Sequence, residues 1–220
     1  MIYLSGLVGF LLVLTTEARV GNSSELVFCS ETKQCLLFDK VCKTDEYEAR
    51  HYDSVKWVST EETSFFLEIA IMKGFRRLYD YITGANVNGE KIEMTAPVVV
   101  KVPDKYFWET GVYTISFLLP AEYQKNPPSP TNNKVYIRNT PDMTVYVQSY
   151  GGWLTTVSDK NTANSLSSAL DQTNADYKKG FHYAVGYNSP MTIIYRHNEV
   201  WFVAEDEPAC SSSEELNFGP

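Results

Sequence analysis

The sequence predicts an α+β fold made of two similar halves. Stretches that alternate polar and apolar residues, typical of half-buried strands, occur on both sides of a proline-rich connection at 125–133. On each side the pattern gives the order strand–strand–helix–strand–strand. The chain also has 15 tyrosines in 220 residues, which suits aromatic pairs across strands. We therefore expect an internal duplication whose sheets close on each other, with the helices packed outside.

The strands of the first half are predicted in three segments. Residues 46–60 alternate and are rich in Tyr, Val and Trp, which indicates two short strands around Asp53 and Ser54. Residues 91–102 and 112–120 are the predicted strands that follow the helix of this half.

The helix of the first half is predicted from about Ser64 to Ile82. Thr63 or Ser64 can cap its first turn, and Gly84 can end it. Its apolar stripe, at helical spacing, consists of Leu67, Ile71, Phe75, Leu78 and Ile82.

The second half repeats this order with a weaker helix. Residues 134–139 and 143–157 predict three strands, the second pair turning at Gly151 and Gly152. A helix follows from about Asp159 to Tyr177, and segments 181–187, 191–196 and 199–205 complete the strands. The helix residues expected to point inward are Ala163, Leu166, Ala169 and Leu170.

The two ends of the chain differ in composition from the predicted domain between them. Residues 2–14 are an apolar run, followed by small or polar residues up to Ala18, which predicts a secretory signal peptide over 1–18 and a secreted, extracellular protein. The alternative is an uncleaved anchor. Residues 19–43 are predicted to be a cysteine-containing extension with a first strand, 44–208 the main domain, and 209–220 an acidic, disordered tail.

Four cysteines fit an exported protein with two disulfides. Three pairings are possible, and we favour Cys29 with Cys35 as a local clip and Cys42 with Cys210 as a tie between the ends. Asn22, followed by two serines, is the only N-glycosylation sequon, and we expect it to be accessible in a polar stretch before the fold begins.

Charge and motifs argue for a binding protein. The formal net charge is -8 and no basic run is present, a poor match to nucleic acid or to an anionic membrane. Neither a G-x-S-x-G nor an H-E-x-x-H motif occurs, so no hydrolase or metalloprotease pattern favours an enzyme.

Four stretches in order carry a family resemblance. "YEARHYDSVKWVST", "KIEMTAPV", "MTVYVQSYGGW" and "GYNSPMTIIYRHNEVWFV" resemble the SOUL heme-binding family over about residues 44–208. The resemblance implies a distorted antiparallel β-barrel made of two pseudo-repeats, each with a helix packed on its sheet. It also implies heme or another tetrapyrrole, bound non-covalently, as the ligand.

The resemblance places the ligand in an apolar slot beside the first helix and near residues 186–190. The residues expected to line it are Met72, Phe75, Arg76, Tyr79 and Tyr187, and Arg76 or Arg77 is expected to meet a propionate. From the residues alone, Met72 and Phe75 are equally well explained as core positions at helical spacing.

His51 is the candidate iron ligand. It takes a position at which one branch of the family carries a histidine proposed for this role, and a neutral imidazole ligates iron well. The alternative is a surface histidine at the end of a strand, because charged residues flank it. His182 and His197 are expected to be a strand residue facing water and a turn residue.

Two functions remain open at this level. The first is a secreted carrier or scavenger of heme or porphyrin. The second is a protein–protein interaction module of the same fold, with an unknown partner and no physiological tetrapyrrole. The family resemblance connects the second to a BH3-like helical segment, matched here by residues 165–174 with Leu166, Leu170 and Asp171.

Overall fold

The computed structural model describes residues 19–208 and Cys210. The predicted signal peptide and the acidic tail beyond Cys210 lie outside the described residues. Both halves show the predicted order of elements. The first comprises β4 (Glu48–Tyr52), β5 (Val55–Ser64), α1 (Leu67–Ile82), β6 (Val98–Pro103) and β7 (Gly111–Leu118), and the second β8 (Val135–Thr140), β9 (Met143–Tyr150), α2 (Thr156–Gln172), β10 (Phe181–Gly186) and β11 (Asn198–Val203).

The strands of both halves join in one antiparallel sheet of order β3-β4-β9-β11-β10-β6-β7-β5-β8. The order from β4 to β8 reads the same in reverse when each strand is exchanged for its counterpart in the other half. The halves are therefore related by a pseudo-twofold axis between β6 and β10. The first strand of each half pairs with the second strand of the other, β4 with β9 and β8 with β5.

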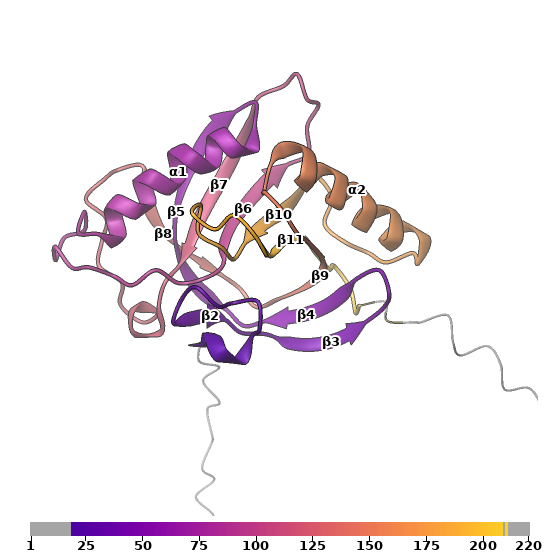
Figure 1. Cartoon of the computed structure of the whole chain (residues 1–220), viewed down its shortest axis with the longest axis horizontal. Helices are drawn as coiled ribbons and strands as arrows, with labels where there is room; N and C mark the ends of the chain where they lie inside the picture. The colour runs from indigo at the N-terminus through magenta and orange to yellow at the C-terminus, as the bar shows by residue number, and fades with distance from the viewer. Residues whose placement is uncertain (1–18, 209, 211–220) are drawn as a thin grey trace, which may run out of the picture.

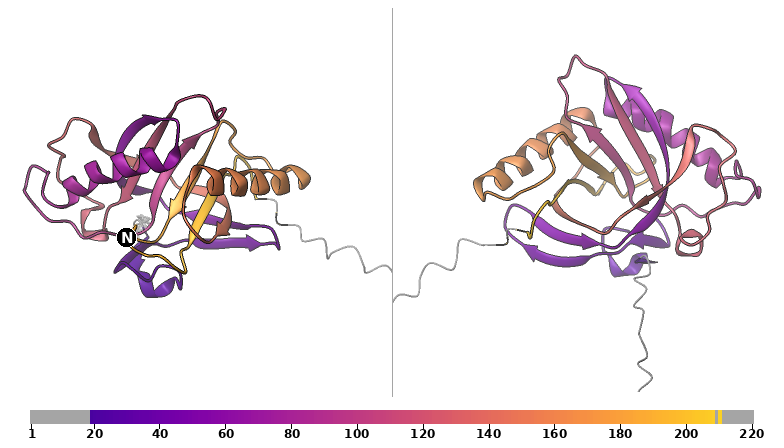
Figure 2. Two further views of the ribbon diagram at one scale, coloured as in Figure 1. Left: turned by 45° about the horizontal axis from the view of Figure 1, so that its top comes forward. Right: turned by 180° about the vertical axis from the view of Figure 1, so that it is seen from behind.

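The sheet is strongly curled. Two-residue links join β4 to β5 and β8 to β9, although the members of each pair lie near opposite ends of the hydrogen-bonded order. The chain satisfies both links only if the ends of the sheet approach each other, as the view from behind shows (Figure 2). The hydrogen-bonded order nevertheless ends at β3 and β8, so closure into a barrel is not confirmed.

The core has three parts, divided by the sheet. Both helices lie on the same, outer side of the sheet (Figure 1). α1 packs mainly on β5 and β7 through Leu67, Ala70 and Leu78, and α2 packs on β9 and β11 through Leu166 and Leu170. The third part fills the inner side of the curl and includes Tyr52, Trp57, Tyr187 and Trp201. Neither helix is long and apolar enough, within the described residues, to cross a bilayer.

The N-terminal extension covers the inner side. It contains β1 (Val20–Asn22), a 3-10 turn (Ser23–Glu25), β2 (Gln34–Leu36) and β3 (Asp39–Lys43), and a second 3-10 turn (Ala121–Tyr123) follows β7. Cys29 pairs with Cys35 and Cys42 with Cys210, in agreement with the favoured pairing. Asn22 is exposed as expected, but it lies within β1, paired opposite Gln34, rather than before the fold.

The helix starts differ from the prediction. α1 begins three residues late, at Leu67, because Ser64 remains in β5 and its hydroxyl accepts a hydrogen bond from the amide of Phe66. α2 begins at Thr156 because Thr155 and Ser158 form a capping box. The strand predicted after Gly152 is therefore absent. α2 also ends at Gln172, short of Tyr177.

One predicted strand, 91–102, begins late, at Val98, and another, 191–196, is absent. Residues 91–97 do not extend β6, because Pro97 has no amide hydrogen and Ala96 donates instead to Gln34 of β2. Residues 191–196 form an exposed loop. β10 already pairs with β6 and β11, and β11 with β9, so neither strand that flanks this segment in the chain has an open edge to receive it.

Candidate functional site

A groove runs beside α1, between the helix and the ends of β6, β10 and β11. We call it the α1 groove, and it encloses about 280 Å³. Gly74 brings α1 close to β7, since a Cβ at this position would lie 2.7 Å from Ile115. Because the Gly74 face of α1 is in contact with β7, the neighbouring face of the helix borders the groove. The lining residues are Glu68, Ile71, Met72, Phe75, Val98, Val100, Trp153, Leu154, Gly186, Asn188, Pro190, Arg196 and Asn198.

The walls of the groove are mostly apolar. Ile71, Met72 and Phe75 form the helix side, and Val98 and Val100 form the sheet side. The Phe75 ring packs edge-on against Phe117, with the ring centroids 4.9 Å apart, which holds it in place. Met72 is 63% exposed, so it is a rim residue and not part of the core.

Arginine side chains lie near the rim of the α1 groove. The Arg196 guanidinium lies 4.5 Å from the centre of the Trp153 ring and donates to the carbonyls of Ser189 and Thr192. Arg76, predicted to line the slot, is exposed on α1 next to Phe75 but is not among the residues that line the groove. Arg77, the other predicted propionate partner, pairs instead with Glu62 and bonds to Thr60 on β5. Among the predicted pair, only Arg76 is thus free to meet an anionic ligand.

The N-terminal extension fixes the loop that borders the groove. The Glu31 carboxylate accepts hydrogen bonds from the Asn188 side chain at 2.7 Å, the Ser189 amide at 2.6 Å and the Thr192 hydroxyl at 2.6 Å. Burial would raise the pKa of Glu31, but these hydrogen bonds outweigh it and hold the pKa below its ordinary value. Because Cys29 and Cys35 close the turn that carries Glu31, the disulfide also supports this loop.

The structure brings together only part of the predicted site. Tyr79 stacks on Phe75 at 6.1 Å, at the edge of the groove and outside its lining. Tyr187 is buried on the inner side of the sheet, where its hydroxyl lies 3.3 Å from Glu199. Arg196 and Trp153 line the groove without having been predicted.

His51 lies away from the groove. It is in β4, with Nδ1 3.3 Å from the Thr144 hydroxyl and Nε2 3.9 Å from the Asp53 carboxylate. Its side chain is 35% exposed, so it is half-buried at the strand end and not fully open to water. None of its contacts is a groove residue. No cluster of three His, Cys, Asp or Glu side chains able to hold a bare metal ion occurs among the described residues.

A buried ionic network lies behind the groove, on the inner side of the sheet. The fully buried Glu199 carboxylate accepts hydrogen bonds from Arg50 at 2.9 Å, His197 at 2.7 Å and the Trp201 indole at 2.7 Å. Burial would raise the pKa of Glu199, but the His197 hydrogen bond and the Arg50 charge outweigh it and lower the pKa. Both oxygens of the Glu199 carboxylate thus already accept hydrogen bonds from the protein, so this carboxylate is not open to a ligand.

Comparison with known proteins assigns the family. The family model described as SOUL heme-binding protein matches residues 33–203. The chain belongs to the SOUL heme-binding family. Human Heme-binding protein 2 is 38% identical over 163 residues, 74% of this chain and 80% of that protein. Heme-binding protein 1 of Xenopus laevis is 30% identical over 158 residues, 71% and 83% of the two chains.

The SOUL fold of this chain is shared with a solved structure of a different kind. The EcmrR C-terminal domain superposes with a TM-score of 0.55 at 13% identity, covering 73% of this chain and 99% of that one. This likeness concerns the fold alone. The family resemblance carried by the four sequence stretches is confirmed.

Proposed function

We propose that the protein binds heme or another tetrapyrrole, non-covalently, in the α1 groove, and acts as a secreted carrier or scavenger. The single observation that supports this most is the groove itself, an apolar trough with cations at its rim. The relatives named heme-binding proteins support the same ligand class. All four cysteines are held in disulfides, so no thiol is left for covalent attachment of a macrocycle.

The chemistry of the groove matches the two parts of a heme. Met72, Phe75 and Val98 offer apolar contact to the macrocycle, and Arg196 offers charge to its carboxylates. Arg76 lies outside the lining, exposed on α1 next to Phe75, and is the second candidate partner for a carboxylate. When bound, heme would supply an iron atom that can accept a ligand from the protein. Met72 is the only groove residue of a side-chain type that ligates heme iron, whereas His51 lies elsewhere.

The size of the groove predicts modest affinity. Burying the faces of a porphyrin removes a few hundred Å² of apolar surface from water, worth on the order of 5–10 kcal/mol at about 25 cal/mol per Å² before the cost of association. The groove volume of about 280 Å³ is below the roughly 300–1,000 Å³ typical of small-molecule sites. Part of the macrocycle would stay in water, so we expect a micromolar or weaker dissociation constant.

We expect Phe75→Ala and Met72→Ala to weaken hemin binding roughly tenfold and severalfold, because each removes apolar contact from the groove. His51→Ala should leave the affinity almost unchanged. The measurement is a titration of each purified variant with hemin, followed by the Soret band. Ile69→Ala is the matched control, since Ile69 is an exposed apolar residue of the same helix outside the groove lining.

Two results would contradict this assignment. Equal hemin uptake by the wild type and both groove variants would remove the α1 groove as the site. Loss of all binding in His51→Ala, with folding confirmed by circular dichroism, would make His51 the anchor and the groove secondary.

Export predicts a modified Asn22. The residue is exposed, so a chain that passes through a eukaryotic secretory pathway should carry a glycan there. Treatment with a peptide N-glycosidase should then lower the apparent mass, and Asn22→Gln should abolish the change. A cell-retained chain of unmodified mass would argue against secretion.

The interaction-module alternative has less support. Of the three matching residues of the BH3-like segment, Leu166 and Leu170 are fully buried on the sheet-facing side of α2, and Asp171 is exposed. A partner that needs both leucines would have to detach the helix from the sheet.

A further inference from the structure

The duplication gives the α1 groove a counterpart in the second half. We call it the α2 cavity, and it encloses about 240 Å³. The α1 groove is lined by the start of β6 and by Gly186 at the end of β10. The α2 cavity is lined by the start of β10, at Phe181 and His182, and by the end of β6, at Val102 and Pro103. The pseudo-twofold axis exchanges these positions, so the two hollows are equivalent in the fold, but their lining differs.

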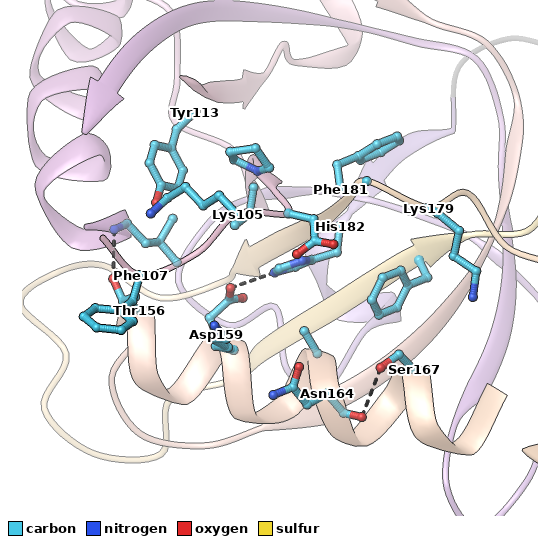
Figure 3. A pocket seen from close by; sticks show the side chains of 18 of the residues that line it. Lys105, Phe107, Tyr113, Thr156, Asp159, Asn164, Ser167, Lys179, Phe181 and His182 are labelled. Carbon is cyan, nitrogen blue, oxygen red and sulfur yellow. Dashed lines mark hydrogen bonds and ion pairs between the residues drawn. The ribbon is translucent and has the colours of Figure 1, made fainter. Parts of the chain in front are cut away.

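A buried carboxylate lines the α2 cavity. Asp159, in the first turn of α2, is only 2% exposed, and its Oδ2 lies 2.7 Å from His182 Nε2 (Figure 3). Its other oxygen, Oδ1, is buried and has no hydrogen-bond partner in the part of the chain that the structure describes. Leaving a buried acceptor unpaired costs about 1–3 kcal/mol, more for a charged group. A ligand that brings a donor, best a cationic one, would satisfy it.

Three lysines line the same cavity, and one of them, Lys179, is already paired with Asp171. Lys105 is held by the carbonyls of Phe65 at 3.0 Å and Glu109 at 2.8 Å, whereas Lys160 is exposed and has no ion pair within the described residues. Burial, followed by repulsion from Lys160, lowers the pKa of Lys105. Two ammonium groups that repel each other across a hollow would both gain from an anion placed between them.

The rest of the wall is apolar and aromatic. Phe107, Tyr177 and Phe202 line the cavity together with Leu67 and Ala163. We propose that the α2 cavity binds a small zwitterion of the amino-acid class. Its ammonium group would meet Asp159 Oδ1, its carboxylate would meet Lys160 and Lys105, and an aromatic or aliphatic body would pack on the wall. This site is independent of the tetrapyrrole site.

The test uses L-phenylalanine as the probe and the ¹⁵N-labelled full chain. Amide shifts in ¹⁵N–¹H spectra, up to about 10 mM ligand, should cluster at 104–107, 159–167 and 179–182 and spare 71–75. 3-Phenylpropionate lacks the ammonium group and phenethylamine lacks the carboxylate. Each should bind roughly tenfold more weakly, because each loses one charge-assisted contact.

Variants separate the two charged contacts. Asp159→Asn and Lys160→Ala should each weaken binding of L-phenylalanine about five- to tenfold, and hemin uptake should stay as in the wild type. Lys178→Ala is the matched control, since this exposed lysine lies outside the cavity lining. If Asp159→Asn fails to fold, Lys160→Ala decides, because its side chain is exposed. No clustered shifts, equal binding of all three probes, or unchanged affinity in Lys160→Ala would each overturn the proposal.

Discussion

Replacing Arg50 by alanine should destabilise the protein by about 3–5 kcal/mol, because it leaves the buried Glu199 carboxylate without its cation. Arg50 bonds to Glu199 and to Glu48, and its guanidinium lies 4.2 Å from the centre of the Phe38 ring. Only 4% of its side chain is exposed, so water cannot replace the lost contacts. Urea unfolding followed by fluorescence of the buried Trp57 and Trp201 measures the loss.

Controls separate the buried ion pair from a surface pair. Lys43 also pairs with Glu48, at 3.2 Å, but its side chain is 65% exposed, and Lys43→Ala should cost less than about 1 kcal/mol. The double variant Arg50→Met with Glu199→Gln removes both charges and should recover part of the loss. Equal stabilities for Arg50→Ala and Lys43→Ala would show that the buried pair contributes little.

The same variant should change the acid dependence of stability. In the wild type the pKa of Glu199 is held below its ordinary 4.5, so its contribution is present above pH 4.5 and is lost as the pH falls through the lowered value. Without Arg50 the pKa of Glu199 rises. The acid unfolding midpoint should therefore move to higher pH.

Removing the Cys42–Cys210 disulfide should cost up to about 5 kcal/mol, the second large effect. The two cysteines are 168 residues apart, so the bridge closes nearly the whole described chain and restricts the unfolded state strongly. The bridge of Cys29 and Cys35 spans only 6 residues and should contribute about 2 kcal/mol by the same chain-entropy argument.

Paired alanine variants test this order. Thermal unfolding of Cys42→Ala/Cys210→Ala should show the larger fall in Tm, although cavity effects add to the cost at the buried Cys29 and Cys35. Alkylation of the native protein without reductant should label no cysteine. A native protein with two reactive thiols would contradict the disulfide assignment, and an unchanged Tm in the long-range variant would contradict the entropic argument.

Local patterns were enough to predict most of the fold. Alternation located β4, β5, β7 and β9, and helical spacing located both helices, because these signals depend on near neighbours in the sequence. The errors lie where a distant part of the chain decides. Residues 191–196 have the composition of a strand, but the neighbouring strands were already paired on both sides.

The candidate site was predicted less completely for a similar reason. Met72 and Phe75 follow from helix geometry combined with the family resemblance. The resemblance places the slot near residues 186–190 and so predicts Tyr187 in its lining. Successive strand residues face opposite sides, however, and Gly186 lines the groove whereas Tyr187 points inward. Arg196 and Trp153 come together only through packing of two loops, and no local pattern marks such a contact. The contact of Asp159 with His182 in the α2 cavity likewise joins α2 to β10, and no local pattern marks it.

The crossed pairing between the halves constrains the order in which the chain can fold during synthesis. Glu48 in β4 pairs with Val147 in β9, so the edge of β4 stays without this partner until most of the chain has left the ribosome. β5 likewise cannot pair with β8 until α1, β6 and β7 have been synthesised. Contacts between such distant segments make folding slow and leave strand edges open to other chains meanwhile. A nascent chain of this topology therefore keeps unpaired strand edges exposed until its second half is complete.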